Sequence, residues 1–176
     1  GDLKAGSLGP LDVLGVYQNT ALSGKISWKE QSAKVFQSLF PQQWNWIIHE
    51  GSIKGQSEFA INGNGVKMKG ELNLKNGKIT MPDSEIYGLN IHFPMNYENS
   101  ALQVASGKPI HISTQNIRYG ALSVANGELD LFGRYPNTMK NPLTLRNVKL
   151  SLFDGVLTVP QLSFPQSKMA TLSFTN

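Results

Sequence analysis

The sequence has no cysteine among its 176 residues, which excludes a disulfide framework, a thiol nucleophile and a cysteine-bound metal. It has no apolar run approaching the 18 residues of a membrane-spanning helix and no charged start followed by an apolar core, so we expect no membrane span or signal peptide within it. Charged residues make up only 16% of the chain, while Gly, Asn, Ser and Thr are plentiful. This balance is typical of short strands and turns, so composition predicts an all-β protein.

The chain also has little that would recognise nucleic acid. Its formal net charge is +4, but it has no arginine-rich run and no aromatic motif of the RNA-reading kind. Its lysines fall on the polar phase of predicted strands or at turns, where lysine keeps sheet edges solvated: Lys54, Lys67, Lys69, Lys75 and Lys78. We therefore expect no nucleic-acid partner.

Catalytic signatures are missing as well. The sequence contains no G-x-S-x-G, H-E-x-x-H or P-loop motif, and no carboxylate pair stands out as a glycosidase pair. The three histidines, His49, His92 and His111, are far apart and none has a partner at metal-ligand spacing. We expect a protein that is not an enzyme and that holds no metal or cofactor.

What the chain does contain is one template repeated three times. Asn76-Gly77, Asn126-Gly127 and Asp154-Gly155 each lie between two runs of alternating apolar residues. Such dipeptides favour two-residue hairpin turns, because the turn positions need positive φ. The predicted cross-strand pairs are all apolar and on one face of each ribbon: Leu74 with Ile79, Leu72 with Met81, Val124 with Leu129, Leu122 with Leu131, Leu152 with Leu157, and Leu150 with Val159.

Other segments complete the expected architecture. Apolar spacing near 3.6 predicts one short helix from Glu30 to Phe40, with Ser27 at capping-box spacing and a Trp-rich segment that packs the helix against the sheet. Pro94 suggests an edge position or a bulge, and a slip in apolar phase predicts a bulge near Arg146-Asn147. The fold class is therefore all-β: an elongated, curved antiparallel sheet of repeated hairpins. From the residues alone, the apolar face is either closed as an ordinary core or left as an open trough.

One family resemblance rests on two stretches in the C-terminal part of the chain. They are Asn-Ile-Arg-Tyr-Gly at 116–120 with Leu-Ser-Val-Ala-Asn-Gly-Glu-Leu at 122–129, and Leu-Arg-Asn-Val-Lys-Leu-Ser-Leu-Phe-Asp-Gly-Val-Leu-Thr-Val-Pro-Gln-Leu at 145–162. This region, 115–174, resembles the C-terminal region of the YdbH family of AsmA-like proteins of Gram-negative bacteria, whose domain has also carried the label "dicarboxylate transport". Family members often have Gly-Gly where this chain has Asp154-Gly155, a change that the same turn accepts.

The resemblance implies a function and a cellular place. It implies an open β-groove segment, 1–176, of a longer periplasmic protein anchored in the inner membrane, with a helix-containing flank at about 28–48 and hairpin repeats at about 51–176. It implies that phospholipid acyl chains occupy an apolar groove between the inner and outer membranes, and that a small outer-membrane lipoprotein is a partner through sheet-edge pairing. The residues expected to line the groove are Leu72, Leu74, Ile79, Met81, Leu89, Ile91, Phe93, Leu122, Val124, Leu129, Leu131, Leu150, Leu152, Leu157 and Val159.

Two hypotheses remain open at this point. One is a lipid-conducting segment, and the other is a non-catalytic structural or assembly scaffold of the cell envelope whose apolar face is closed by protein. The apolar Phe153 and Val156, on the otherwise polar face beside the third turn, indicate a contact with a neighbouring segment or partner. What covers the apolar face separates the two hypotheses.

Overall fold

The structure is a computed structural model that describes residues 2–8, 11–98, 101–104, 108–135, 140, 142–164 and 173–175. Within them the chain forms one sheet of fourteen strands in which every pairing is antiparallel. Its strands are β1 (Asp2–Leu8), β2 (Leu11–Gln18), β3 (Ala21–Ser32), β4 (Ile47–Asn62), β5 (Gly65–Met81), β6 (Ser84–Glu98), β7 (Ala101–Val104), β8 (Ile110–Thr114), β9 (Asn116–Tyr119), β10 (Leu122–Phe132), β11 (Arg134–Tyr135), β12 (Leu143–Leu152), β13 (Gly155–Phe164) and β14 (Ser173–Thr175).

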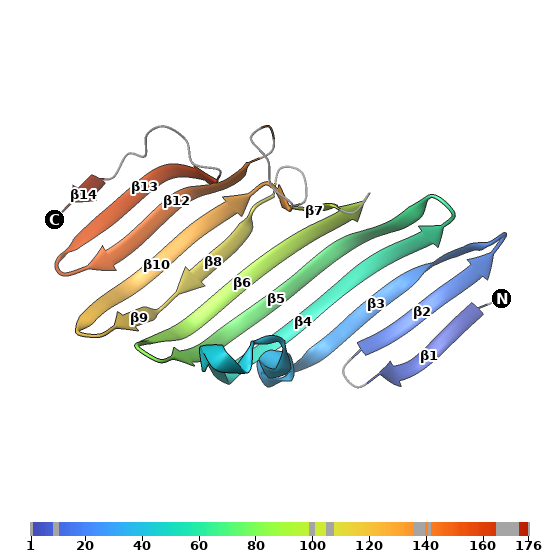
Figure 1. The fold of residues 1–176 in the computed structure, drawn as a ribbon, viewed down its shortest axis with the longest axis horizontal. Helices are drawn as coiled ribbons and strands as arrows, with labels where there is room; N and C mark the ends of the chain where they lie inside the picture. The colour runs from blue at the N-terminus through green and yellow to red at the C-terminus, as the bar shows by residue number, and fades with distance from the viewer. Residues whose placement is uncertain are drawn as a thin grey trace.

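Strand order along the sheet follows the sequence, so the first strands lie at one end and the last strands at the other (Figure 1). Two 3₁₀-helices, η1 (Ala33–Leu39) and η2 (Gln42–Trp44), lie together at one long border of the sheet. We call this the helix border; the turns 82–83, 120–121 and 153–154 lie along it too. The opposite border, here the loop border, carries the turns 19–20 and 63–64. The fold class predicted from the sequence is confirmed as all-β and antiparallel.

Two of the three predicted hairpins are wrong. Asn76-Gly77 lies inside the continuous strand β5, and Asn126-Gly127 lies inside β10. At both places the pairing register shifts, and Asn76 has a φ of 54°, so each Asn-Gly forms a bulge and not a turn. Leu74 and Ile79, like Val124 and Leu129, therefore follow one another along a strand.

The third hairpin exists, but its turn is one residue earlier than predicted. Leu152 pairs with Gly155, so the two turn residues are Phe153 and Asp154, and Phe153 has a φ of 54°. Leu150 consequently faces Leu157 and not Val159. Each residue of β12 therefore pairs two residues earlier in β13 than predicted. Because side chains alternate with a period of two, every side chain stays on its predicted face.

The predicted bulge near Arg146-Asn147 is confirmed, since the register with β10 shifts there and Asn147 has a φ of 56°. Pro94 lies where β6 changes partner from β8 to β7, a place where a missing N–H costs no ladder bond on that side. Between β10 and β12 lies the two-residue strand β11, and residues 136–139 and 141 lie outside the described residues.

The helical segment is shorter and tighter than predicted. It is the 3₁₀-helix η1, and its cap is Ser32, whose side chain accepts a hydrogen bond from the Lys34 amide; Ser27 belongs to β3. In the Trp-rich segment, the ring of Trp46 contacts the ring of Phe40, the C-cap of η1 (5.5 Å between centroids), and the ring of Trp44 (4.8 Å). In the described part of the chain, the helices are too short and too polar to cross a membrane.

Two glycines allow the sheet to curve. A Cβ at Gly24 would overlap the Leu14 carbonyl oxygen, and one at Gly70 would overlap the Gln56 carbonyl oxygen. Any side chain at either position would force neighbouring strands apart, so these glycines let the sheet bend more tightly than a strand of larger residues would.

Candidate functional site

The register of the sheet brings one apolar side chain from each of five neighbouring strands into a row. Ile53 of β4 pairs with Leu74 of β5, which pairs with Ile91 of β6, followed by Ile112 of β8 and Leu129 of β10. Side chains of directly paired residues lie on the same face. The row therefore runs across the middle of the sheet on what we call the apolar face.

The adjacent residues of the same strands form an equally regular row on the other face. It consists of Lys54, Asn73, His92, His111 and Asp130, each paired with the next. We call this side the polar face. The chain thus separates its apolar and polar side chains between two faces of one sheet, as one-sided burial requires.

All the residues predicted to line a groove lie on the apolar face by this register. Leu72, Leu74, Ile79, Leu89, Ile91 and Phe93 also line one cavity of about 420 Å³. The remaining predicted residues extend the same face beyond the cavity, at the end of β5 and along β10, β12 and β13: Met81, Leu122, Val124, Leu129, Leu131, Leu150, Leu152, Leu157 and Val159.

Sequence reasoning missed the other side of this cavity. Ala33, Phe36 and Phe40 come from η1 and its C-cap, and Ile48 and Ile53 come from β4. Ala33, Ile48 and Ile53 are buried, and Ile53 is only 2% exposed. The helical spacing of apolar residues in 33–40 could have predicted this side of the cavity, because a helix with one apolar stripe buries that stripe against another part of the protein.

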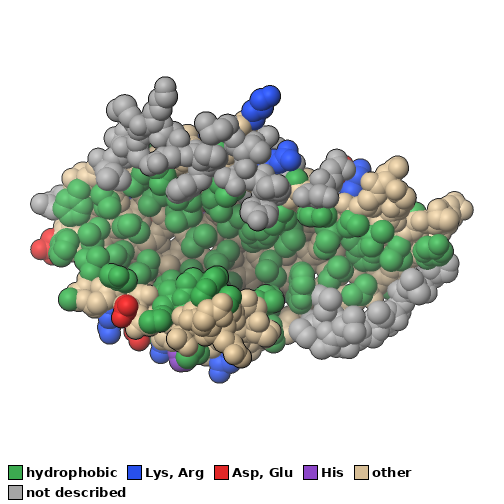
Figure 2. Space-filling view, in the orientation of Figure 1, with side chains coloured by type: hydrophobic (Ala, Val, Ile, Leu, Met, Phe, Trp, Pro, Cys, Tyr) green, Lys and Arg blue, Asp and Glu red, His purple; other side chains and the backbone are tan. Residues whose placement is uncertain are grey.

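The segment from η1 to Trp46 forms a roof over one end of the apolar face. The side-chain amide of Gln37 fastens it: Nε2 donates to the Trp46 carbonyl at 2.7 Å, and Oε1 accepts from the Ile48 amide at 2.7 Å. Figure 2 shows the apolar face as a broad hollow of hydrophobic side chains, with this segment at its lower border. Elsewhere on the face, the described residues place no second layer of helix or strand.

Glu50 is the one charged residue among the described residues that line the cavity. It pairs with Lys78 across the β4–β5 register and is exposed, so its carboxylate reaches solvent at the helix border. The cavity interior is otherwise aliphatic and aromatic. Such a lining suits a hydrocarbon ligand.

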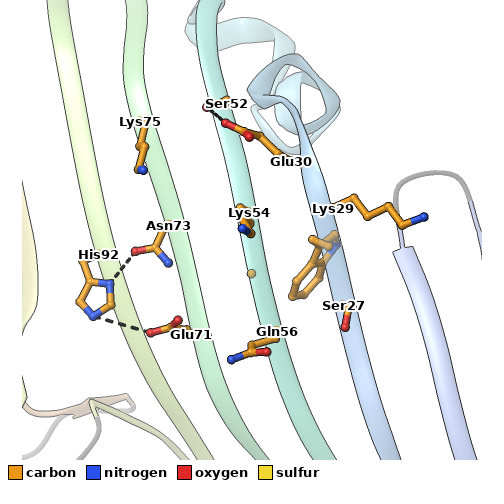
Figure 3. A pocket seen from close by; sticks show the side chains of 12 residues that line it. Ser27, Lys29, Glu30, Ser52, Lys54, Gln56, Glu71, Asn73, Lys75 and His92 are labelled. Atoms are coloured by element: carbon orange, nitrogen blue, oxygen red, sulfur yellow. Dashed lines mark hydrogen bonds and ion pairs between the residues drawn. The ribbon is translucent and has the colours of Figure 1, made fainter.

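The polar face has a hollow of its own, of about 760 Å³, over β3 to β6 (Figure 3). There the Nδ1 of His92 lies 2.5 Å from Oδ1 of Asn73, and its Nε2 lies 3.9 Å from Glu71. Lys54 and Lys75 also line this hollow, as does Glu30, which accepts a hydrogen bond from Ser52 at 3.4 Å. Positively and negatively charged side chains are interspersed here, so neither sign of charge dominates this solvated hollow.

The next residues along the polar row form a compact network. The Nδ1–H of His111 donates to Asp130 at 2.6 Å, and the Asn147 amide donates to the same carboxylate at 3.0 Å. Partial burial alone would raise the pKa of Asp130, but these hydrogen bonds outweigh it and hold the pKa below its ordinary value of 3.8. Among the described residues, no three His, Asp or Glu side chains gather where they would hold a metal ion.

A long antiparallel sheet with one continuous apolar face and one polar face defines a class of protein that presents an extended hydrophobic surface. Comparison with known proteins shows the family to which the chain belongs. The family model described as "YdbH-like: Intermembrane phospholipid transport protein YdbH" matches residues 1–176. The chain therefore belongs to the YdbH-like family, and the match extends over the whole chain, beyond the stretch 115–174 that carries the resemblance in the sequence.

A curated relative agrees with this assignment. The chain is 32% identical over 177 residues to the "Probable phospholipid transport protein YdbH" of Escherichia coli strain K12. The alignment covers 100% of this chain and 20% of that protein, so the chain spans about a fifth of its relative's length. No solved structure matches the chain.

Proposed function

We propose that the apolar face holds phospholipid acyl chains as one segment of a longer periplasmic bridge that carries lipid between the inner and outer membranes. The observation that carries this proposal is the continuous apolar row Ile53–Leu74–Ile91–Ile112–Leu129, which has a roof only at its η1 end among the described residues. Contiguous apolar surface of this extent is rarely left bare in water and favours a ligand. The name and family description of the relative supply the class of ligand.

The proposal includes a place and partners for the whole protein. The full-length protein is anchored in the inner membrane and extends through the periplasm, and a small outer-membrane lipoprotein adds a strand to the sheet. The register supports strand addition: among the described residues, the outer side of β13 pairs only at Val156–Thr158. An unpaired strand edge is a ready template for another strand.

Site-specific photo-crosslinking tests the lipid proposal. A photoreactive amino acid at Leu74 or Leu129 should crosslink to phospholipid, because both side chains lie on the apolar face. The matched controls are Asn73 and Lys75, which neighbour Leu74 in β5 and line the polar hollow. Native mass spectrometry of the purified chain should detect bound phospholipid.

Equal crosslinking from both faces would refute the assignment of the lipid to the apolar face. Crosslinks from Leu74 and Leu129 to protein, with no lipid bound, would favour the scaffold hypothesis, in which another protein closes this face.

A further inference from the structure

The cavity under the roof is closed more tightly at the helix border than toward the middle of the apolar face. Near the border, Ile48 is buried and forms one cluster with the buried Ala33 and Ile53. Toward the middle of the face, Leu72 and Phe93 also line the cavity, but both are only half-buried. The cavity therefore opens onto the apolar face and ends beneath η1.

The floor of the cavity contains a position without a side chain. Gly77 lines the cavity, and a Cβ built on it would lie 3.2 Å from the Cβ of Leu89 and 3.3 Å from Cδ2 of Leu74. Leu89 and Leu74 line the cavity too, so a side chain at position 77 would occupy part of its volume. The cavity owes part of its depth to this glycine.

Two aromatic side chains form the roof side of the cavity. Phe36 lies in η1 and Phe40 is its C-cap, and both pack against the buried cluster. Leu39 of the same helix is 71% exposed and does not line the cavity. The two phenylalanines therefore limit the room beneath η1, while Leu39 faces solvent.

The lining of the cavity suits the methyl end of an acyl chain and not a head group. Among the described residues that line it, no side chain is a cation or a hydrogen-bond donor, and the one charged side chain, Glu50, is negative. A phosphate or glycerol group placed there would lose hydration without gaining a side-chain partner, which is costly. Hydrocarbon carries no such cost, and the hydrophobic hollow in Figure 2 continues from the roof across the apolar face.

We propose that this cavity receives the methyl end of one acyl chain of a bound phospholipid, and that Phe36 and Gly77 determine the chain length that fits. This inference rests on the proposed function. It adds an orientation, with the chain end beneath η1 and the head group away from the helix border, and a preference among chain lengths. Because the volume of the cavity is limited to about 420 Å³, a chain that is too long leaves methylene groups in water. Each methylene left in water weakens binding about fourfold.

Two photoreactive phospholipids test the orientation on the unmodified chain. They share one head group and one chain length, and they carry a diazirine either at the methyl end of a chain or next to the glycerol. After illumination, mass spectrometry maps the crosslinked peptides. The methyl-end probe should label residues 33–53 and 72–93 more strongly than the glycerol-end probe does, because these segments line the cavity. Equal labelling by the two probes, or the reverse pattern, would overturn the orientation.

Two variants of opposite effect test the preference for chain length. The chain is incubated with vesicles of phosphatidylcholines that differ only in acyl-chain length and is re-isolated, and native mass spectrometry quantifies the bound lipids. Phe36→Ala enlarges the cavity and should raise the ratio of longer to shorter bound chains about fourfold for each methylene that it newly admits. Gly77→Ala adds a methyl group to the floor and should lower the same ratio by up to about fourfold.

Two control variants separate a change in the cavity from general damage. Leu39→Ala removes an exposed apolar side chain of η1, and Gly63→Ala adds a Cβ at a position where it would meet nothing within 4 Å. Neither control should change the ratio of bound chains. Circular dichroism confirms that the variants fold, and the probe experiment needs no variant, so it decides the orientation by itself.

A ratio that stays unchanged in Phe36→Ala and Gly77→Ala, or that moves in the same direction in both, would overturn the role of these two residues while leaving lipid binding intact. Absence of any lipid on the unmodified chain would instead refute the proposed function on which this inference rests.

Discussion

Replacing Gln37 with alanine should loosen the roof over the apolar cavity. The Gln37 amide makes two hydrogen bonds of 2.7 Å, to the Trp46 carbonyl and from the Ile48 amide, and it connects η1 to the start of β4. A net hydrogen bond contributes about 1 kcal/mol, and both backbone groups lose their partner in the variant. We therefore expect opening of the roof to become easier by about 2 kcal/mol, which raises the population of the open state about thirtyfold.

Hydrogen exchange at the Ile48 amide measures this effect directly, because that N–H is the donor to Gln37. Its exchange rate in Gln37→Ala should rise about thirtyfold when exchange follows local opening. Gln43→Ala is the matched control, since Gln43 lies in the same segment with its side chain exposed. The indole fluorescence of Trp44 and Trp46 should change in Gln37→Ala alone.

An Ile48 exchange rate in Gln37→Ala within about threefold of the control would refute the reasoning, because hydrogen bonds of this kind have measurable local effects. The roof would then be held by the ring contacts of Phe40 and Trp46 and not by the amide.

Three further predictions concern stability. Ile53→Ala should cost about 3 kcal/mol in urea unfolding, because the side chain is 2% exposed and its removal leaves a cavity; a loss below about 1 kcal/mol would contradict its place in the core. Phe153→Asn should stabilise the chain by about 1 kcal/mol in the same assay, since Phe153 is 81% exposed, has a φ of 54° and loses little packing, and Asn tolerates this conformation better. Asp130→Asn should destabilise the chain at neutral pH, and the difference should vanish in acid. The lowered pKa of the Asp130 carboxyl, held by His111 and Asn147, contributes stability above its unfolded value of 3.8 that is lost as pH falls through the folded pKa. A difference that persists in acid would show that the carboxylate charge is not the cause.

The sequence predicted the faces of the strands more reliably than the turns between them. Leu74 and Ile79 lie on one face, as the template requires, but through a bulge at Asn76 and not through a hairpin. Leu74 and Ile79 are separated by an odd number of positions, so in an uninterrupted strand they would lie on opposite faces. A two-residue turn and a one-residue bulge each place both residues on the same face, so the alternation of apolar residues cannot distinguish the two. Whether the dipeptide forms a turn or a bulge is decided by pairing with neighbouring strands, whose residues are distant in sequence.

The turns that the template missed have weaker local signals. Gly120-Ala121 closes β9 onto β10, and Phe153 occupies a turn position with positive φ, where sequence statistics favour Asn or Gly. The roof was predicted only as a helix that packs on the sheet. Its position over Ile48 and Ile53 depends on the Gln37 contacts, which no periodicity encodes.

The bulges also explain how strands of this length keep one apolar face. β5 has 17 residues and β6 has 15, well above the usual strand, and twist accumulates along a long strand. Asn76 in β5 and Gly88 in β6 both have positive φ, and the Asn76 amide donates to the Asn90 side chain at 3.1 Å, so the two irregularities are adjacent and coupled. Each bulge re-aims the following residues, which brings Ile79 and Ile86 into the same face as Leu74 and Ile91. The Asn-Gly dipeptides therefore do not end the ribbons of this sheet; they shift the pairing register, so that the apolar residues on either side of each dipeptide lie on one continuous face.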